Sequence, residues 1–193
     1  MTSDTLHDTS TEHGDHAELD AQERLDELGT ARSTSAIAER AELLRVLGRL
    51  DEALAVAEES YRLAFFTGDR ERVTEARLRR ARVLRDKGSL DRALSEAKAC
   101  RQTARTEGWG ELEASALYQQ ANMLVESGRL DDARDTVSQL IELRMAQHAP
   151  PEHIASLNRA LEVILRRMIP ESPGSLPAPS PASSSTPPTP PRA

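Results

Sequence analysis

The chain has 193 residues, of which 38% are hydrophobic and only 3% aromatic, so Ala, Leu, Val and Ile must supply its core. No apolar run approaches the roughly 18 to 20 residues that span a bilayer, and the first residues lack the pattern of an export signal. The single cysteine excludes an intrachain disulfide and with it the disulfide-stapled secreted class. These features predict a cytoplasmic protein.

The formal charge of -7 is concentrated near the N-terminus. Residues 1–30 hold nine acids against the single base Arg24, whereas residues 31–168 hold 23 bases and 22 acids. Residues 1–16 are rich in Asp, Thr, Ser and His, and they have few apolar side chains to bury. We therefore expect a disordered acidic leader there, followed by a short helix over residues 20–29.

Five glycines then divide the chain at equal intervals: Gly48, Gly68, Gly88, Gly108 and Gly128. Glycine just past a helix end is the preferred way to turn the chain, and no proline interrupts residues 17–149. Each interval therefore predicts one helix and one turn. About 16 helical residues at 1.5 Å each give helices of roughly 24 Å.

Two such helices form one unit that spans two glycine intervals, as from Gly48 to Gly88, and this unit occurs three times. The phrases GRLDEAL, GSLDRAL and GRLDDAR mark the turn inside each unit, and the units span about 33–68, 73–108 and 113–148. Small residues recur where two antiparallel helices must approach closely, and leucines fill the seam between them. The aligned positions are Ala41, Ala81 and Ala121; Leu44, Leu84 and Leu124; Leu50, Leu90 and Leu130; Asp51, Asp91 and Asp131; and Ala53, Ala93 and Ala133.

A last helix is expected over residues 151–168, where Leu157, Leu161 and Ile164 follow Leu117, Ala121 and Leu124 in the same register, one unit later. It would cover the open edge of the third unit. The sequence therefore predicts an all-α fold: an α-solenoid of three antiparallel helix pairs with a C-terminal capping helix, over residues 17–168. Residues 169–193 are rich in Pro and Ser and predict a disordered tail, in which PPTPPR resembles an SH3 ligand but is more simply a spacer.

The repeated pattern resembles the tetratricopeptide repeat (TPR) family, whose units carry Ala, a bulky residue, Gly, a bulky residue and Ala at these offsets. The clearest unit reads QQANMLVESGRLDDARDTVSQL, and the resemblance covers residues 33–148. The usual unit is shorter, at about 34 residues, and has a proline between units. The longer period here looks more like the variants in kinesin light chains and bacterial regulators, and HEAT-type helix pairs remain an alternative.

The sequence offers little for catalysis. His148 stands at the very end of the third unit, the other four histidines lie outside the units, and no phosphate-binding glycine motif occurs. Cys100 aligns with Ser60 and Leu140, which predicts a buried structural thiol. His7, His13 and His16 lack the spacing of a helical metal site, so we expect no enzyme activity, no cofactor and no metal.

The resemblance implies that the first helix of each pair lines a concave groove that binds a protein or peptide. These helices are expected at residues 33–47, 72–87 and 111–127, and the middle one is rich in arginine, which suits capture of carboxylates. We therefore predict a scaffold or adaptor that binds an acidic or extended segment. The expected groove residues are Glu42, Arg45, Leu78, Arg82, Arg85, Tyr118, Asn122, Val125 and Glu126.

Three further possibilities remain open at this point. The arginine-rich helix over residues 70–87 could instead bind nucleic acid or phosphate, although it lacks interleaved aromatic residues. The acidic leader could lie over this basic helix until a partner displaces it. End helices could also stack on copies of themselves, which would give self-association.

Overall fold

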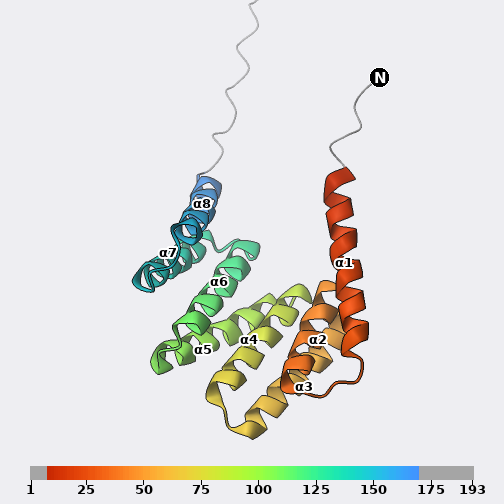
Figure 1. The fold of residues 1–193 in the computed structure, drawn as a ribbon. Coiled ribbons are helices and arrows are strands. Elements are labelled where there is room, and N and C mark those ends of the chain that lie inside the picture. The colour runs from red at the N-terminus through yellow and green to blue at the C-terminus, as the bar shows by residue number, and fades with distance from the viewer. Residues whose placement is uncertain (1–7, 170–193) are drawn as a thin grey trace, which may run out of the picture.

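The computed structural model describes residues 8–169, and this part of the chain is all-helical and contains no strand. Its helices are α1 (Asp8–Leu28), α2 (Thr34–Val46), α3 (Leu50–Thr67), α4 (Arg70–Asp86), α5 (Leu90–Glu107), α6 (Gly110–Glu126), α7 (Leu130–Ala146) and α8 (Pro151–Met168). Each helix packs against the next one along the chain, and the helices follow a curved path with α1 and α8 at its ends (Figure 1). The fold is an α-solenoid, as predicted.

The predicted pairs are α2 with α3, α4 with α5, and α6 with α7. The first helices of successive pairs also touch, since α2 contacts α4 and α4 contacts α6. These three helices therefore form a continuous inner layer, and α3, α5 and α7 form the outer layer (Figure 1). The inner layer is where a groove was expected.

The evenly spaced glycines end the helices. All five adopt a positive φ, between 69° at Gly48 and 78° at Gly88, which is the left-handed region that glycine enters without steric cost. The next position in the series is occupied by His148, which has a φ of 54° and is the one non-glycine residue in this region among residues 8–169. The left-handed conformation therefore recurs at each position of the evenly spaced series, even where the residue is not glycine.

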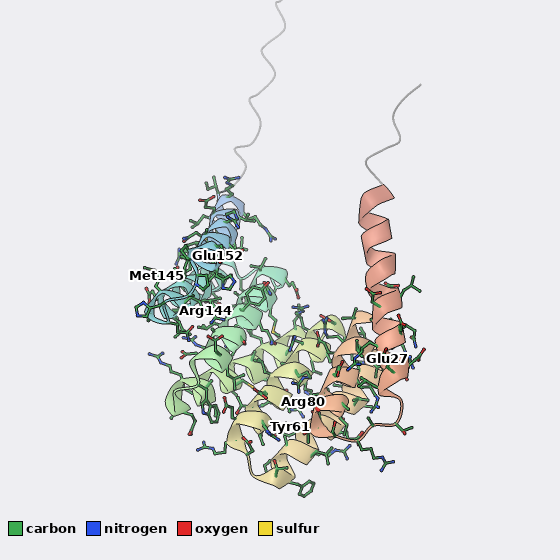
Figure 2. All side chains as sticks on the ribbon, viewed as in Figure 1. Glu27, Tyr61, Arg80, Arg144, Met145 and Glu152 are labelled. Carbon is green, nitrogen blue, oxygen red and sulfur yellow. The ribbon has the colours of Figure 1, made fainter. Side chains whose placement is uncertain are left out.

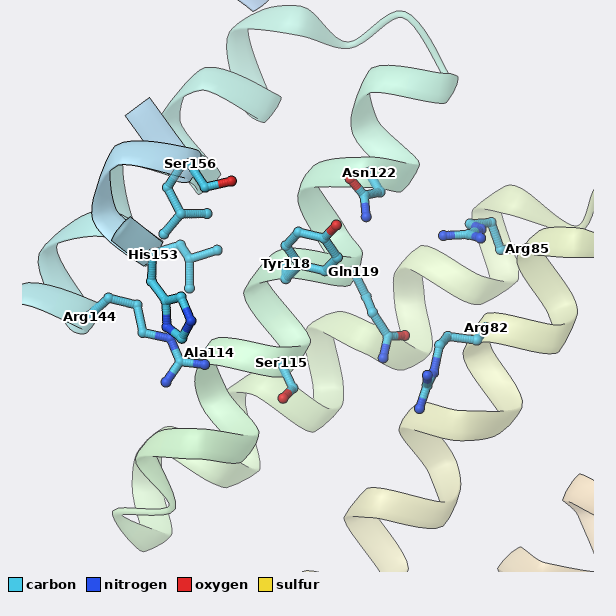
Figure 3. A pocket seen from close by; sticks show the side chains of 12 residues that line it. Arg82, Arg85, Ala114, Ser115, Tyr118, Gln119, Asn122, Arg144, His153 and Ser156 are labelled. Atoms are coloured by element: carbon cyan, nitrogen blue, oxygen red, sulfur yellow. The ribbon is translucent and has the colours of Figure 1, made fainter. Parts of the chain in front are cut away.

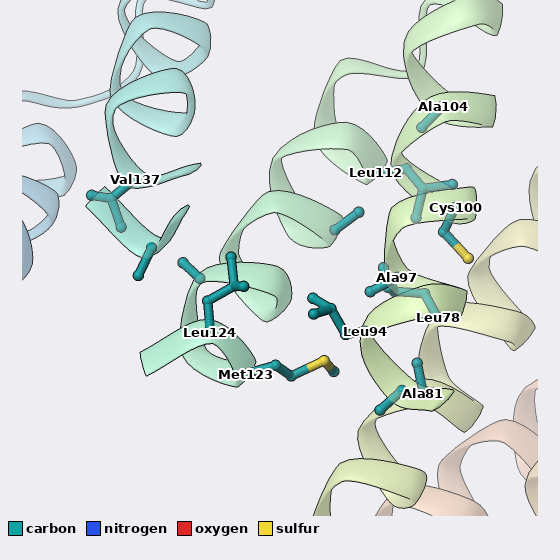
Figure 4. Close-up of a cluster of buried hydrophobic side chains, with 14 of the residues drawn as sticks. Leu78, Ala81, Leu94, Ala97, Cys100, Ala104, Leu112, Met123, Leu124 and Val137 are labelled. Atoms are coloured by element: carbon teal, nitrogen blue, oxygen red, sulfur yellow. The ribbon is translucent and has the colours of Figure 1, made fainter. Parts of the chain in front are cut away.

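The repeated alanines and leucines form the core. Ala41, Ala81 and Ala53 have no exposed surface, and the leucines aligned with Leu44 are almost fully buried. The largest cluster extends over α4, α5, α6, α7 and α8 and includes Leu84. Figure 4 shows part of it, with Met123 and Leu124. Because the facing alanines are small, the helices approach closely and the leucines fill the remaining space.

Helix α1 is longer than predicted. Residues 8–16, which we expected to be disordered, form its first turns, because extending an existing helix costs much less than starting one. Leu25 packs against the cluster that contains Ala41 and Leu44, and α1 therefore covers the N-terminal end of the array. The C-terminal part of α1 packs beside α2, whereas its first turns extend away from the other helices and do not lie over α4 (Figure 1). Residues 1–7 lie outside the described range.

Helix α8 covers the other end. Ile154, Leu157 and Leu161 pack against the main core, and Ile164 is buried. The predicted capping helix is confirmed with its expected bounds. The tail over residues 170–193, with its PPTPPR stretch, lies outside the described residues.

Among the described helices, none combines the length and the apolar character that crossing a membrane requires.

Candidate functional site: a pocket on the inner layer

A pocket of about 440 Å³ opens between α4, α6, α7 and α8. It brings together four of the predicted groove residues, namely Arg82, Arg85, Tyr118 and Asn122 (Figure 3). The other residues that line the pocket come from α6, α7 and the capping helix, and they were not predicted from the sequence. These are Ala114, Ser115, Gln119, Leu140, Arg144, His153, Ser156 and Leu157.

The wall formed by α6 is amphipathic. The Tyr118 side chain is 56% exposed, although it is large and aromatic, and Asn122 lies one turn further along the same helix. Gln119 is buried, and its Oε1 atom has no hydrogen-bond partner within the described residues. In Figure 3 the Gln119 amide extends into the space between α6 and α4, toward Arg82. A buried acceptor without a partner is costly, so a donor from a ligand would be favourable here.

The prediction that Leu78 lines the groove is wrong. Leu78 is only 3% exposed and belongs to the main core, where it packs among residues of α5 and α6. Its aligned positions, Ala38 and Tyr118, both line pockets. Consecutive units leave a gap between them, which we call the notch. In the middle of the array the Leu78 side chain fills this notch, and this explains the difference. Val125 is likewise half-buried and packs against the main core.

A second pocket, of about 500 Å³, lies between α2, α3 and α4. Its lining residues Ser35, Ala38 and Ala64 are the equivalents, two full units earlier, of Ser115, Tyr118 and Arg144 in the first pocket. The two pockets are therefore the same structural notch, open in the first and last units and filled in the second. Since packed helices lie about 8 to 10 Å apart, two such notches are separated by roughly 20 Å along the array.

The groove arginines are paired with acids of neighbouring units. Arg45 contacts Asp86 at 2.6 Å, and Arg85 contacts Glu126 at 3.7 Å. The two pairs have the same separation in sequence, from 45 to 86 and from 85 to 126, so the second is a looser repeat of the first. Arg82 also lies 3.5 Å from Glu42 of the preceding unit. These residues link neighbouring units. Arg82 and Arg85 also line the pocket beside Tyr118, whereas the predicted groove residues Glu42, Arg45 and Glu126 are not among its lining residues.

Glu42 is held in its ionised form. Burial would raise the pKa of this carboxyl, but a hydrogen bond from Arg45 and the charges of Arg82, Arg45 and Arg79 outweigh burial and lower its pKa. In turn, the hydrogen bond to Glu42 raises the pKa of Arg45 in spite of the opposing effect of burial. The ion pair between Glu42 and Arg45 therefore stabilises the charged form of both side chains.

Helix α4 is less available to phosphates than its sequence indicates. Arg80 donates two hydrogen bonds to the buried carboxylate of Glu96, at 2.9 and 3.0 Å, and its guanidinium lies 4.5 Å from the centre of the Tyr61 ring (Figure 2). Arg85 is paired with Asp86 in addition to Glu126. These internal pairs neutralise much of the positive charge that a nucleic acid would need.

The remaining candidate groups behave as structural residues. Cys100 is buried, its thiol lies 3.5 Å from the carbonyl oxygen of Thr74, and burial raises its pKa to about 12. Such a thiol is a poor nucleophile. Among residues 18–169, whose side chains the structure describes, no group of His, Cys, Asp and Glu is arranged to hold a metal ion. His7 lies outside this range, as do the side-chain positions of His13 and His16.

Comparison with known proteins agrees with the architecture. No family model matches the sequence, and no curated protein sequence matches it either. Among solved structures, the α-solenoid is similar to the crystal structure of BtubC (BKLC) from P. vanneervenii, with a TM-score of 0.61 and 16% sequence identity. The similarity covers 82% of this chain and 67% of that chain. At this identity the likeness concerns the fold alone.

Proposed function

We propose that this chain is a noncatalytic scaffold of the TPR type, which binds an extended, acidic segment of a partner protein along its inner layer. The observation that carries the proposal is the pocket beside Tyr118. Its lining includes the cationic side chains Arg82, Arg85 and Arg144, and no Asp or Glu is among its lining residues. An exposed tyrosine beside arginines is typical of surfaces that bind protein segments.

The internal ion pairs are compatible with an acidic ligand. A guanidinium has five N–H donors, and Arg85 approaches Glu126 only to 3.7 Å, so it retains donors for an incoming carboxylate. Arg144 is held by Glu111 at the edge of the pocket. These pairs hold the arginines in place before binding, which reduces the entropy lost when a ligand arrives.

An extended segment also fits the spacing of the two notches. At about 3.3 Å per residue, roughly six residues of extended chain bridge the distance of roughly 20 Å between them. The first notch is lined mainly by small residues, together with Arg72, Glu75 and Arg79, whereas Tyr118 and three cations line the last. We therefore expect the segment's larger side chain to bind beside Tyr118.

Affinity capture from native lysate tests this proposal. The bait proteins are the intact chain, the Tyr118→Ala, Asn122→Ala double variant, and a matched Asn158→Ala, Val163→Ala variant on the exposed face of α8. We expect a protein that the intact chain and the α8 variant retain and the Tyr118 variant loses. Equal retention by all three baits would rule out the pocket as the binding site.

A further inference from the structure

A third pocket, of about 420 Å³, lies where the end of α3 and the first half of α4 meet α5. Helix α4 contributes Arg70, Val73, Thr74 and Arg77, which form one stripe along the helix at intervals of three and four positions. This stripe differs from the one that carries Arg82 and Arg85. We call this site the aromatic pocket; its other lining residues are Tyr61, Phe65, Gly68, Cys100 and Thr103.

Both phenylalanines of the chain are exposed, and Phe65 lines this pocket. Phe65 is 64% exposed and Phe66 is 85% exposed, at the end of α3. The aligned residues in the next unit are Arg105 and Thr106, so the repeat itself does not require aromatic side chains at these positions. Adjacent exposed aromatic residues in a chain with so few of them indicate an interaction surface.

Arg77 occupies a position that is hydrophobic in the other units. The aligned residues, Ile37 and Leu117, are buried in the core. Arg77 instead lines the aromatic pocket, its Nε atom is buried without a hydrogen-bond partner, and it forms no ion pair within the described residues. By contrast, Arg70 is paired with Glu107 at 2.6 Å. An unpaired arginine at a core position has no role in the repeat and leaves a cation in the pocket wall.

The charged side chains that line the aromatic pocket are all positive. Two arginines line it, and no Asp or Glu is among its lining residues. A carboxylate that reached Arg77 would form charge-assisted hydrogen bonds with a guanidinium that has no protein acid to compete. The neighbouring rings of Tyr61 and Phe65 would cover an apolar side chain next to that carboxylate.

We propose that the aromatic pocket is a second binding site, separate from the groove, for a partner-protein segment in which an acidic residue adjoins an aromatic one. The carboxylate binds Arg77, and the aromatic side chain packs against Tyr61 and Phe65. Phe66 extends the apolar contact beyond the pocket. This proposal is independent of the groove, because none of these residues lines the pocket beside Tyr118.

A peptide titration tests the proposal with the full chain. The probe is the acetylated, amidated peptide Gly-Ser-Asp-Phe-Leu-Gly-Ser, and its control carries Asn in place of Asp. Binding is followed by ¹H–¹⁵N NMR of the protein, including the Nε–H signal of Arg77. We expect shifts confined to Arg77 and the other residues that line the aromatic pocket, and about tenfold weaker binding of the Asn peptide, because it lacks the charge-assisted hydrogen bond.

Two variants separate the contribution of the Arg77 charge from that of the two phenylalanine rings. Arg77→Gln should abolish the preference for Asp over Asn, and the exposed double variant Phe65→Ala, Phe66→Ala should weaken both peptides equally. The proposal is overturned by equal binding of the two peptides to the intact chain, by shifts centred on Tyr118 and Gln119, or by no binding at millimolar peptide. It is also overturned if sedimentation shows a dimer that the Phe65, Phe66 variant dissolves, since a second copy would then be the occupant.

Discussion

Arg45 on α2 donates a hydrogen bond to the carboxylate of Asp86 on α4, at 2.6 Å, and thereby joins the first unit to the second. Asp86 also accepts a hydrogen bond from Arg85 at 2.9 Å, which in turn lies near Glu126 of the third unit. A chain of alternating charges thus runs across the inner layer through all three units. These ion pairs therefore link the three units of the array.

Removal of the central acid should loosen this connection. Asp86→Asn removes the charge that both arginines share, so we expect the free energy of unfolding in urea to fall by about 1 to 2 kcal/mol. The matched control is Asp132→Asn on α7, whose side chain is half exposed and pairs with Arg129 within one helix turn. The control should change stability by less than about 0.5 kcal/mol. Equal losses from both variants would contradict a special role for Asp86.

The pair of Arg80 and Glu96 is the most buried ion pair among the described residues. Glu96→Ala leaves the guanidinium of Arg80 buried without a carboxylate, so we expect a loss of about 3 to 5 kcal/mol in the free energy of unfolding. The double variant Arg80→Met, Glu96→Leu removes both charges and should recover most of this loss. If the double variant is as unstable as the single one, packing and not the uncompensated charge explains the effect.

His148 is a position where a substitution should stabilise the protein. Its φ of 54° places a non-glycine residue where the earlier turns use glycine. The left-handed conformation costs about 1 to 2 kcal/mol for most residues, and the extra entropy of glycine in the unfolded chain offsets part of that. We expect His148→Gly to stabilise by about 0.5 to 1 kcal/mol, measured as a raised thermal midpoint. Gly128→Ala should lower the midpoint, and a lowered midpoint for His148→Gly would show that the His148 side chain contributes other contacts.

The lowered pKa of Glu42 predicts a dependence of stability on pH. In the unfolded chain this carboxyl has a pKa of about 4.3, and its pKa in the folded protein is lower. Its contribution to stability is therefore complete above about pH 4.3 and is lost as the pH falls through the folded-state value. We expect the intact chain to lose more stability than Glu42→Gln on acidification from about pH 6 to about pH 3. Parallel curves for the two proteins would contradict the coupling of Glu42 to the arginines.

The helices could be predicted from the sequence because their ends depend on local chemistry. Each glycine of the evenly spaced series takes the left-handed conformation, so the expected bounds of α2, α4 and α6 lie close to the observed ones. The capping role of 151–168 followed from the same register. The predicted N-terminal end of α1 was wrong. The composition of residues 8–16 does not show that the helix that follows them extends back into this segment.

The site was harder to predict because its residues come from different units. The positions of Ala38, Leu78 and Tyr118 are equivalent in sequence, yet whether one is exposed depends on how much of the notch its neighbours fill. Arg144 and His153 were missed since they reach the pocket from α7 and α8. The ion pairs between units did leave a signal in the sequence, because the step from Arg45 to Asp86 equals the step from Arg85 to Glu126.

Photo-crosslinking from position 118 tests directly whether the pocket beside Tyr118 binds an acidic, extended segment. A benzoylphenylalanine residue replaces Tyr118 in the full chain, and a control protein carries it at Asp131, which is highly exposed on the outer layer. After irradiation in native lysate, mass spectrometry identifies the attached peptides. We expect a dominant adduct between position 118 and an acidic, extended peptide, and we expect position 131 not to form this adduct. The same adducts from both positions, or none from position 118, would contradict this expectation.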